Sequence, residues 1–214
     1  MRTRSRAPWW FRLAVVIVVL LALGVGGVFA WQFWWIPRAV VASADDAAAT
    51  FRQACTSPTP PATPDEASDG ATIALLELPG SPVIWPIRAG VEDYNMGAGV
   101  AWYRQTSQPG DLGNMAVSGR RLVSGGPFDG ILELNEGDKI VVETCDMRHT
   151  YTLVVAPRDL TVQPDDAWVL DTVPGQSGII PTEAWLTLIA NQDIKPSSDL
   201  AVGFASLTAS EPIR

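Results

Sequence analysis

An uninterrupted run of 24 residues without a charge, residues 13–36, constrains this 214-residue chain more than any other feature. As an α-helix the run would extend about 36 Å, at roughly 1.5 Å per residue, against a hydrocarbon core of about 30 Å. Aromatic residues flank both ends, where such rings favour the boundary between lipid headgroups and water. They are Trp9, Trp10, Phe11, Trp31, Phe33, Trp34 and Trp35. We therefore expect a transmembrane helix over 13–36.

Basic residues are distributed asymmetrically about this run. Four arginines precede it, and only Arg38 follows closely. Since basic residues favour the cytoplasmic side of a membrane helix, we expect a cytoplasmic tail over 1–12 and a single-pass protein of the plasma membrane with its C-terminal domain outside. A cleaved signal peptide is the alternative, because Val28-Phe29-Ala30 fits a cleavage site. Against it, the run is longer than a usual signal core, and the second aromatic cluster lies beyond that site.

The chain after residue 38 is acidic. It carries ten basic and 23 acidic residues, a net charge of −13. This balance argues against a nucleic-acid partner, since neutralising phosphates requires clustered lysine and arginine. A single histidine makes a multi-histidine metal site impossible, and we expect neither metal nor cofactor. Two cysteines are too few for a disulfide scaffold.

Composition divides the exported part into a spacer and a domain. Residues 37–71 are predicted to be the spacer, with a short alanine-rich helix over 39–54. From residue 57 the spacer is proline-rich: residues 57–70 hold four prolines, three acidic residues and no large apolar side chain. Such a segment cannot bury enough surface to fold alone, and its prolines keep it extended.

Residues 72–214 are predicted to form an all-β barrel or sandwich, because short apolar runs alternate with proline and glycine turns. One short helix is expected within 92–103. The expected strands are 73–78, 82–87, 114–118, 132–134, 139–144, 149–155, 184–189 and 200–207.

Five stretches between residues 73 and 207, taken in order, resemble the sortase family, nearest the class E or D type of Gram-positive actinobacteria. Residues 109–121 are similar to the family's "PG-x-x-GN-hydrophobic-A-hydrophobic-x-GHR", and 126–128 to "G-x-PF". The other three are 134–144, similar to "L-x-x-GD-x-I-x-V-x-T", 168–175, similar to the "V-L-x-P-T" stretch, and 186–188, which begins "LTLxTC". The resemblance implies a membrane anchor, a spacer and an eight-stranded β-barrel with one or two short helices.

The residues that carry sortase chemistry do not stand at the matching positions. The family uses a cysteine nucleophile, a histidine for proton transfer and an arginine that holds substrate and oxyanion. Here Arg120 occupies the histidine position and Asn191 the cysteine position, and the arginine position falls near Asp199 or on Leu200. The resemblance therefore implies a degenerate member, a pseudo-sortase.

A displaced catalytic pair is the alternative. Cys145 and His149 lie four residues apart at an expected hairpin tip, where opposite strands could bring a thiol and an imidazole together. A cysteine in a surface loop and a histidine on an edge strand explain the same spacing without chemistry, because nearness in sequence is not a site.

Five residues are candidates for lining a retained groove: Arg120, Trp185, Thr187, Asn191 and Asp199. Trp185 could instead pack in or on the barrel, as such residues do more often. An ion pair between Arg120 and Asp199 or Asp193 would fill the vacated cleft, and a solvated Arg120 is its alternative.

The only two cysteines, Cys55 and Cys145, both fall in the exported part, where an oxidising setting permits a disulfide. Such a bridge would tie the spacer to the hairpin tip. Two free thiols, or an intermolecular bridge through Cys55, remain open, because nothing in the sequence sets their distance.

These observations favour a membrane-anchored, catalytically inactive domain that binds a peptide sorting signal, a cell-wall component or another surface protein. The second hypothesis is an active sortase-type cysteine transpeptidase or hydrolase with a displaced nucleophile. The third hypothesis is a purely structural barrel whose cleft is filled.

Overall fold

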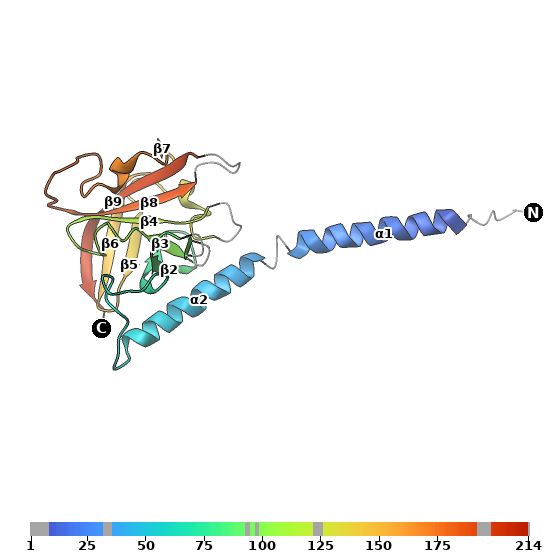
Figure 1. The fold of residues 1–214 in the computed structure, drawn as a ribbon, viewed down its shortest axis with the longest axis horizontal. Coiled ribbons are helices and arrows are strands. Elements are labelled where there is room, and N and C mark those ends of the chain that lie inside the picture. Colours follow the sequence, from blue (N-terminus) through green and yellow to red (C-terminus); the bar gives the residue numbers. More distant parts are fainter. Residues whose placement is uncertain are drawn as a thin grey trace, which may run out of the picture.

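The computed structural model describes residues 9–31, 36–92, 95–96, 99–121, 126–191 and 198–213. Within them, two helices lead into a β-barrel (Figure 1). The helices are α1 (Trp9–Ala30) and α2 (Ile36–Cys55), with short 3₁₀ turns η2 (Ile131–Glu133) and η3 (Ala167–Leu170). The strands are β1 (Thr72–Glu77), β2 (Ile84–Ala89), β3 (Val100–Trp102), β4 (Gly113–Ser118), β5 (Lys139–Glu143), β6 (Met147–Val155), β7 (Thr161–Val162), β8 (Ala184–Asn191) and β9 (Leu200–Pro212).

Eight of these strands form a closed ring. Their order is β6-β5-β1-β2-β3-β4-β8-β9, and pairing of β9 with β6 closes it. The two-residue β7 pairs with β9 outside the ring. Closure removes free sheet edges, which is how small antiparallel barrels avoid edge-to-edge association. The predicted eight-stranded barrel is thereby confirmed.

The barrel buries side chains in two layers. Large apolar side chains, including those of Trp102, Tyr151 and Phe128, fill the interior. A second apolar cluster lies beneath the connection between β6 and β8, and it holds Val162, Val169, Ile189, Val202 and Phe204. This outer layer explains why all six residues of β4 are buried and why β8 does not alternate. The two strands are covered on both faces.

Two predicted elements are wrong in detail, and two strands were not predicted. The expected strand 132–134 is the 3₁₀ turn η2, which follows the buried Phe128. Two short strands were not predicted, β3 and β7, because two or three residues are too few to show a periodicity. Within the expected helix 92–103, Asn95 and Met96 are helical, but β3 occupies its end. Residues 93, 94, 97 and 98 lie outside the described residues.

Helix α1 is long and apolar enough to cross a membrane. The candidate span runs over Trp9–Val28, with a mean hydropathy of 2.5 and no buried share. It begins earlier than the predicted 13–36, because the flanking tryptophans Trp9 and Trp10 are helical. Residues 32–35 lie outside the described residues.

The predicted spacer is not a free tether. Its first part is α2, whose Ala44, Ala48 and Phe51 are buried against the barrel. These residues are four and three positions apart, the spacing of one helix face. The proline-rich part also returns to the barrel: Ala67 is buried, and the Arg104 guanidinium donates a hydrogen bond to its carbonyl. The folded unit therefore begins with α2 rather than at residue 72.

Candidate functional site

Strands β4, β8 and β9 bring Arg120, Asn191 and Leu200, the three positions singled out by the motif matches, to one end of the barrel. β4 and β8 run parallel with Ser118 opposite Ile189, and the Gly119 amide donates to the Ile189 carbonyl at 3.1 Å. β9 runs antiparallel to β8, with Leu200 directly opposite Asn191. Arg120, which follows Gly119, therefore lies at the same end as Asn191 and Leu200. We call Arg120, Arg121, Asn191 and Leu200 the rim.

Backbone contacts hold the rim together. Arg121 Nη1 donates to the Asn191 carbonyl at 3.3 Å, which links the end of β4 to the end of β8. The Arg120 carbonyl accepts a hydrogen bond from the Phe128 amide, also at 3.3 Å. All four rim residues are half-buried. The rim is thus accessible from solvent, and its scaffold is built from three strands and the segment around Phe128.

Asp199, the residue before β9 and an expected ion-pair partner of Arg120, makes a hydrogen bond to another side chain. Asp199 Oδ1 accepts a hydrogen bond from Gln163 Nε2 at 2.8 Å, which ties the rim to the loop after β7. Asp193 lies outside the described residues. The predicted ion pair with Arg120 therefore stays a prediction.

Below the rim, a buried polar cluster ties the long connection onto β4 and β8. The Asn114 side chain, 1% exposed, donates to the carbonyls of Val169 and Asp171 at 2.9 and 3.1 Å. Its Oδ1 accepts a hydrogen bond from Thr187 Oγ1 at 2.6 Å. Thr187 is fully buried, so its side chain is part of the scaffold and not of a groove wall, contrary to the expectation. Both faces of β8 are buried, so its sequence does not show the alternation of apolar and polar residues from which the direction of the Thr187 side chain could have been predicted.

Trp185 lies away from the rim. It stands at the start of β8, paired with Asn114 and Ser206, and six residues before Asn191. At about 3.3 Å per residue this is roughly 20 Å along the strand. Its ring packs against the outer apolar cluster and lines a separate pocket of about 250 Å³ with Ile179 and Ile180. Trp185 and Asn191 therefore do not line one groove.

A larger pocket, of about 420 Å³, opens beside the rim and was missed by the sequence reasoning. The turn 78–81, the segment 126–134 and Asp138 line it. Phe128, which stands between the lining residues Pro127 and Asp129, donates a backbone hydrogen bond to the Arg120 carbonyl and so links this wall to the rim. The turn pairs Pro79-Gly80 and Gly126-Pro127 are the only sequence signal for it, and such pairs mark loops, not pockets.

The displaced pair, Cys145 and His149, is not formed. Cys145 is joined to Cys55 in a disulfide with a Cα–Cα distance of 5.2 Å. His149 lies on β6, where its Nδ1 is 2.9 Å from Ser210 Oγ and its ring lies against Gly110. Along β9, Ser210 is ten residues from Leu200, roughly 33 Å of strand. Within the described residues, no group of three or more His, Cys, Asp or Glu side chains could hold a metal ion.

Burial lowers the pKa of His149 below its usual value, and the nearby Asp111 carboxylate only partly opposes this effect. The folded protein therefore binds this proton less readily than the unfolded chain, so stability is expected to fall as the pH drops through about 6.5. Urea unfolding at pH 5 and pH 8 measures this loss. His149→Gln should remove most of the difference, and an undiminished difference would contradict the assignment.

Comparison with known proteins identifies the family to which this chain belongs. The sequence pattern of the sortase domain matches residues 76–202. The chain belongs to the sortase family. The matched range contains Arg120, Asn191 and Leu200.

Individual sortases of class E are among the similar proteins. Sortase SrtE1 of Streptomyces coelicolor is 31% identical over 169 residues, which is 74% of this chain and 46% of that protein. This chain thus spans less than half the length of that relative. Sortase E from Streptomyces avermitilis superposes with a TM-score of 0.60 at 28% identity, over 68% of this chain and 93% of that one. The SrtA sortase from Actinomyces oris gives 0.63 at 25% identity, over 69% and 85%.

Proposed function

We propose that this chain is a membrane-anchored, extracellular sortase-like protein that binds a peptide or a cell-surface component without forming an acyl-enzyme. The supporting observation is the strand register at the rim. It brings the three residues that stand where the family carries histidine, cysteine and arginine to one end of the barrel. The motif matches therefore agree with the geometry, and a slipped alignment is disfavoured.

None of the side chains of Arg120, Asn191 and Leu200 can perform the step of the residue that it would replace. The guanidinium of Arg120 stays protonated at all relevant pH, so it cannot accept a proton from a thiol. The Asn191 amide is no nucleophile, and Leu200 has no donor for a developing oxyanion. What Arg120 and Asn191 offer instead are hydrogen-bond donors, which suit binding.

The chain holds no substitute for the missing thiol and imidazole. Both of its cysteines lie in the described part and are joined to each other, which leaves no free thiol. Its single histidine packs against Gly110 and Ser210, and Ser210 lies ten residues along β9 from Leu200. An acyl transfer would need the disulfide to open and Cys145 to meet a base other than His149.

The partner class follows from the family and from the pocket beside the rim. Candidates are a peptide sorting signal, a cell-wall component and another surface protein. Helix α1 would anchor the chain in the plasma membrane, with residues 1–12 in the cytoplasm and the barrel outside, in line with the four arginines that precede the span.

Activity is tested with the full chain in phosphatidylcholine nanodiscs, mixed with a sortase-type sorting peptide and an amine acceptor. Mass spectrometry follows the products with the disulfide closed and after reduction. We expect no cleavage in either state. Cleavage that requires reduction and is abolished by Cys145→Ala would instead establish the displaced-nucleophile transpeptidase.

The restored variant Arg120→His/Asn191→Cys/Leu200→Arg tests the geometry directly. Because β4, β8 and β9 bring positions 120, 191 and 200 to one end of the barrel, we expect this variant to form an acyl adduct on residue 191 that the parent chain never shows. The matched control is Arg120→His/Leu200→Arg, which lacks the nucleophile and should show no adduct. A folded restored variant without an adduct would mean that the rim is not the family's catalytic position.

A further inference from the structure

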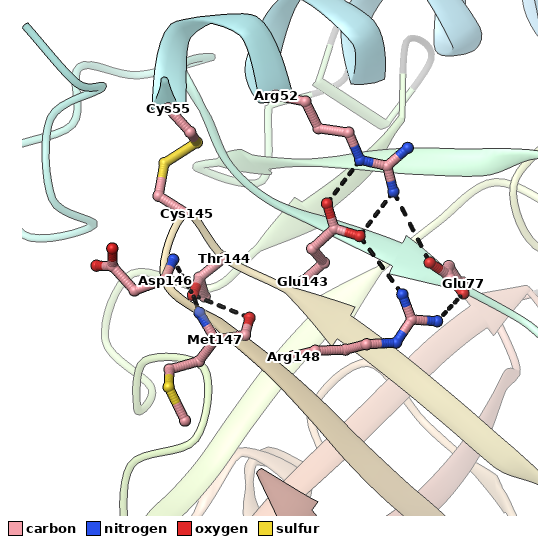
Figure 2. A network of polar contacts seen from close by, with 9 residues as sticks. All are labelled: Arg52, Cys55, Glu77, Glu143, Thr144, Cys145, Asp146, Met147 and Arg148. Atoms are coloured by element: carbon pink, nitrogen blue, oxygen red, sulfur yellow. Dashed lines mark hydrogen bonds and ion pairs between the residues drawn. A yellow bond between two sulfur atoms is a disulfide. The ribbon is translucent and has the colours of Figure 1, made fainter. Parts of the chain in front are cut away.

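Helix α2 is attached to the β5–β6 hairpin at a single place, its last turn (Figure 2). Arg52 Nε and Nη2 each donate to a different carboxylate oxygen of Glu143, both at 2.6 Å. Three residues further along α2, Cys55 is bonded to Cys145, which follows Glu143 by two residues. One turn of the helix and one end of the hairpin thus share a covalent and an ionic link.

The ionic link is a small network of four alternating charges. Arg148 on β6 donates from Nη2 to Glu77 Oε2 at 2.6 Å and lies 3.6 Å from Glu143. Arg52 lies 3.9 Å from Glu77. The two arginines are 44% and 41% exposed at their side chains, so water and salt screen their pairs with Glu77. Glu143 is 9% exposed and accepts two hydrogen bonds from Arg52, so this pair orients the last turn of α2 and acts beside the disulfide.

The apolar face of α2 is small. Among residues 38–55, whose side chains the structure describes, Ala44, Ala48 and Phe51 are the buried ones, and only Phe51 is large. Val40 and Val41 add partial contacts. Two buried alanines and one ring remove little apolar surface from water, compared with a typical core-facing helix. The disulfide is therefore the strongest single link between α2 and the barrel.

The bridge is placed where a reductant can reach it. Cys55 is the last residue of α2 and Cys145 lies in the turn between β5 and β6, and both are half-buried at the surface. Attack by a thiolate requires such access to one sulfur. Opening this bridge would not disturb a strand of the ring, because both cysteines lie outside the strands.

We propose that the Cys55–Cys145 bridge is a redox-operated latch that sets how far the barrel reaches from the membrane helix. An external dithiol transfers two electrons and two protons to the bridge. The S–S bond breaks, two cysteine thiols form, and the dithiol becomes a disulfide. With the latch closed, α2 lies on the barrel; with it open, α2 leaves the barrel and lengthens the tether.

Release of α2 lengthens the tether by roughly 10–15 Å. With α2 docked from Val40, residues 32–39 separate Trp31 from the barrel, and a chain segment of that length, half of it helical, spans at most about 20 Å. With α2 released, the tether runs from residue 32 to residue 66, because Ala67 remains buried on the barrel, and its mean span as a flexible chain is roughly 33 Å. This inference rests on the membrane anchorage in the proposed function, not on the chemistry at the rim.

Deuterium exchange of the full chain in phosphatidylcholine nanodiscs tests the latch, with the bridge closed and after treatment with a small dithiol. We expect amides of α2 to exchange about tenfold faster after reduction, while those of β4 and β8 stay protected. Cys55→Ser/Cys145→Ser should exchange like the reduced chain and ignore the dithiol. Arg52→Gln, with the bridge intact, should keep α2 protected.

Three outcomes would overturn the latch. One is unchanged protection of α2 after reduction, and another is release of α2 by Arg52→Gln alone. The third is loss of protection throughout β4 and β8, which would make the bridge a requirement of the fold. Deuterium exchange is measured without a peptide, so none of these outcomes tests binding at the rim. Conversely, peptide cleavage in the activity assay would contradict the proposed function but not the latch.

Discussion

Replacing Asn114 with alanine is expected to lower the free energy of unfolding by about 3–4 kcal/mol. The substitution removes the donors for two carbonyls, of Val169 and Asp171, and the acceptor for Thr187 Oγ1. These atoms lie in the dry layer between the strands and η3, and each unsatisfied polar atom there costs about 1–3 kcal/mol before any relaxation. Urea unfolding followed by tryptophan fluorescence measures the loss.

Thr187→Val is the matched control, because it removes one of the three hydrogen bonds and keeps the volume of the side chain nearly unchanged. A loss of about 1–2 kcal/mol is expected for it. The double variant should lose less than the sum of the two, since the residues share one bond. Equal losses for Asn114→Ala and Thr187→Val would show that the carbonyls of Val169 and Asp171 find water without cost.

The barrel was predictable because its turn residues and strand residues stand in family order. The rim was predictable for the same reason: Arg120 and Asn191 are named by the motifs in which they stand, and parallel pairing of β4 with β8 places their ends together. The register of β9 then supplies Leu200 as the third position. The order of the motifs along the chain was enough to place these residues at strand ends, and that placement does not depend on where their side chains point.

Side-chain direction on covered strands was not predictable. Burial of both faces of β4 and β8 erases the alternation that separates inside from outside, so Thr187 was expected in a groove and lies in the scaffold. The covering connection reaches these strands through Asn114, which bonds to residues 55 and 57 positions away. Contacts between residues so far apart in the sequence leave no local pattern from which they could be predicted.

The docking of α2 was hidden for a different reason. Its buried face consists mainly of alanines, and other alanines of the same segment, Ala39, Ala42 and Ala49, are exposed, so alanine content alone did not mark the docked face. The bridge between Cys55 and Cys145 closes a separation of 90 residues, and two cysteines alone do not set a distance. The expected spacer therefore turned out to be half helix and half returning loop.

Gly110→Ala is expected to cost about 3 kcal/mol of stability. Gly110 has φ of +84°, a conformation that costs an L-residue about 1–2 kcal/mol. A Cβ there would also overlap the imidazole of His149, which is held on Ser210 and is 7% exposed. Either the ring leaves its partner or the loop moves, and the Gly110 amide then loses its 2.9 Å bond to the Tyr151 hydroxyl.

A double-mutant cycle with His149→Ala separates these two costs. Removing the ring makes room for the new Cβ, so Gly110→Ala should cost only its backbone strain, about 1–2 kcal/mol, in the His149→Ala background. Thermal or urea unfolding of the four chains at pH 8, where His149 is neutral, measures the coupling. Strictly additive losses would mean that the overlap with the ring is relieved by a small movement of the 109–112 loop. In that case the packing of His149 on Gly110 would contribute little to holding this loop against β6.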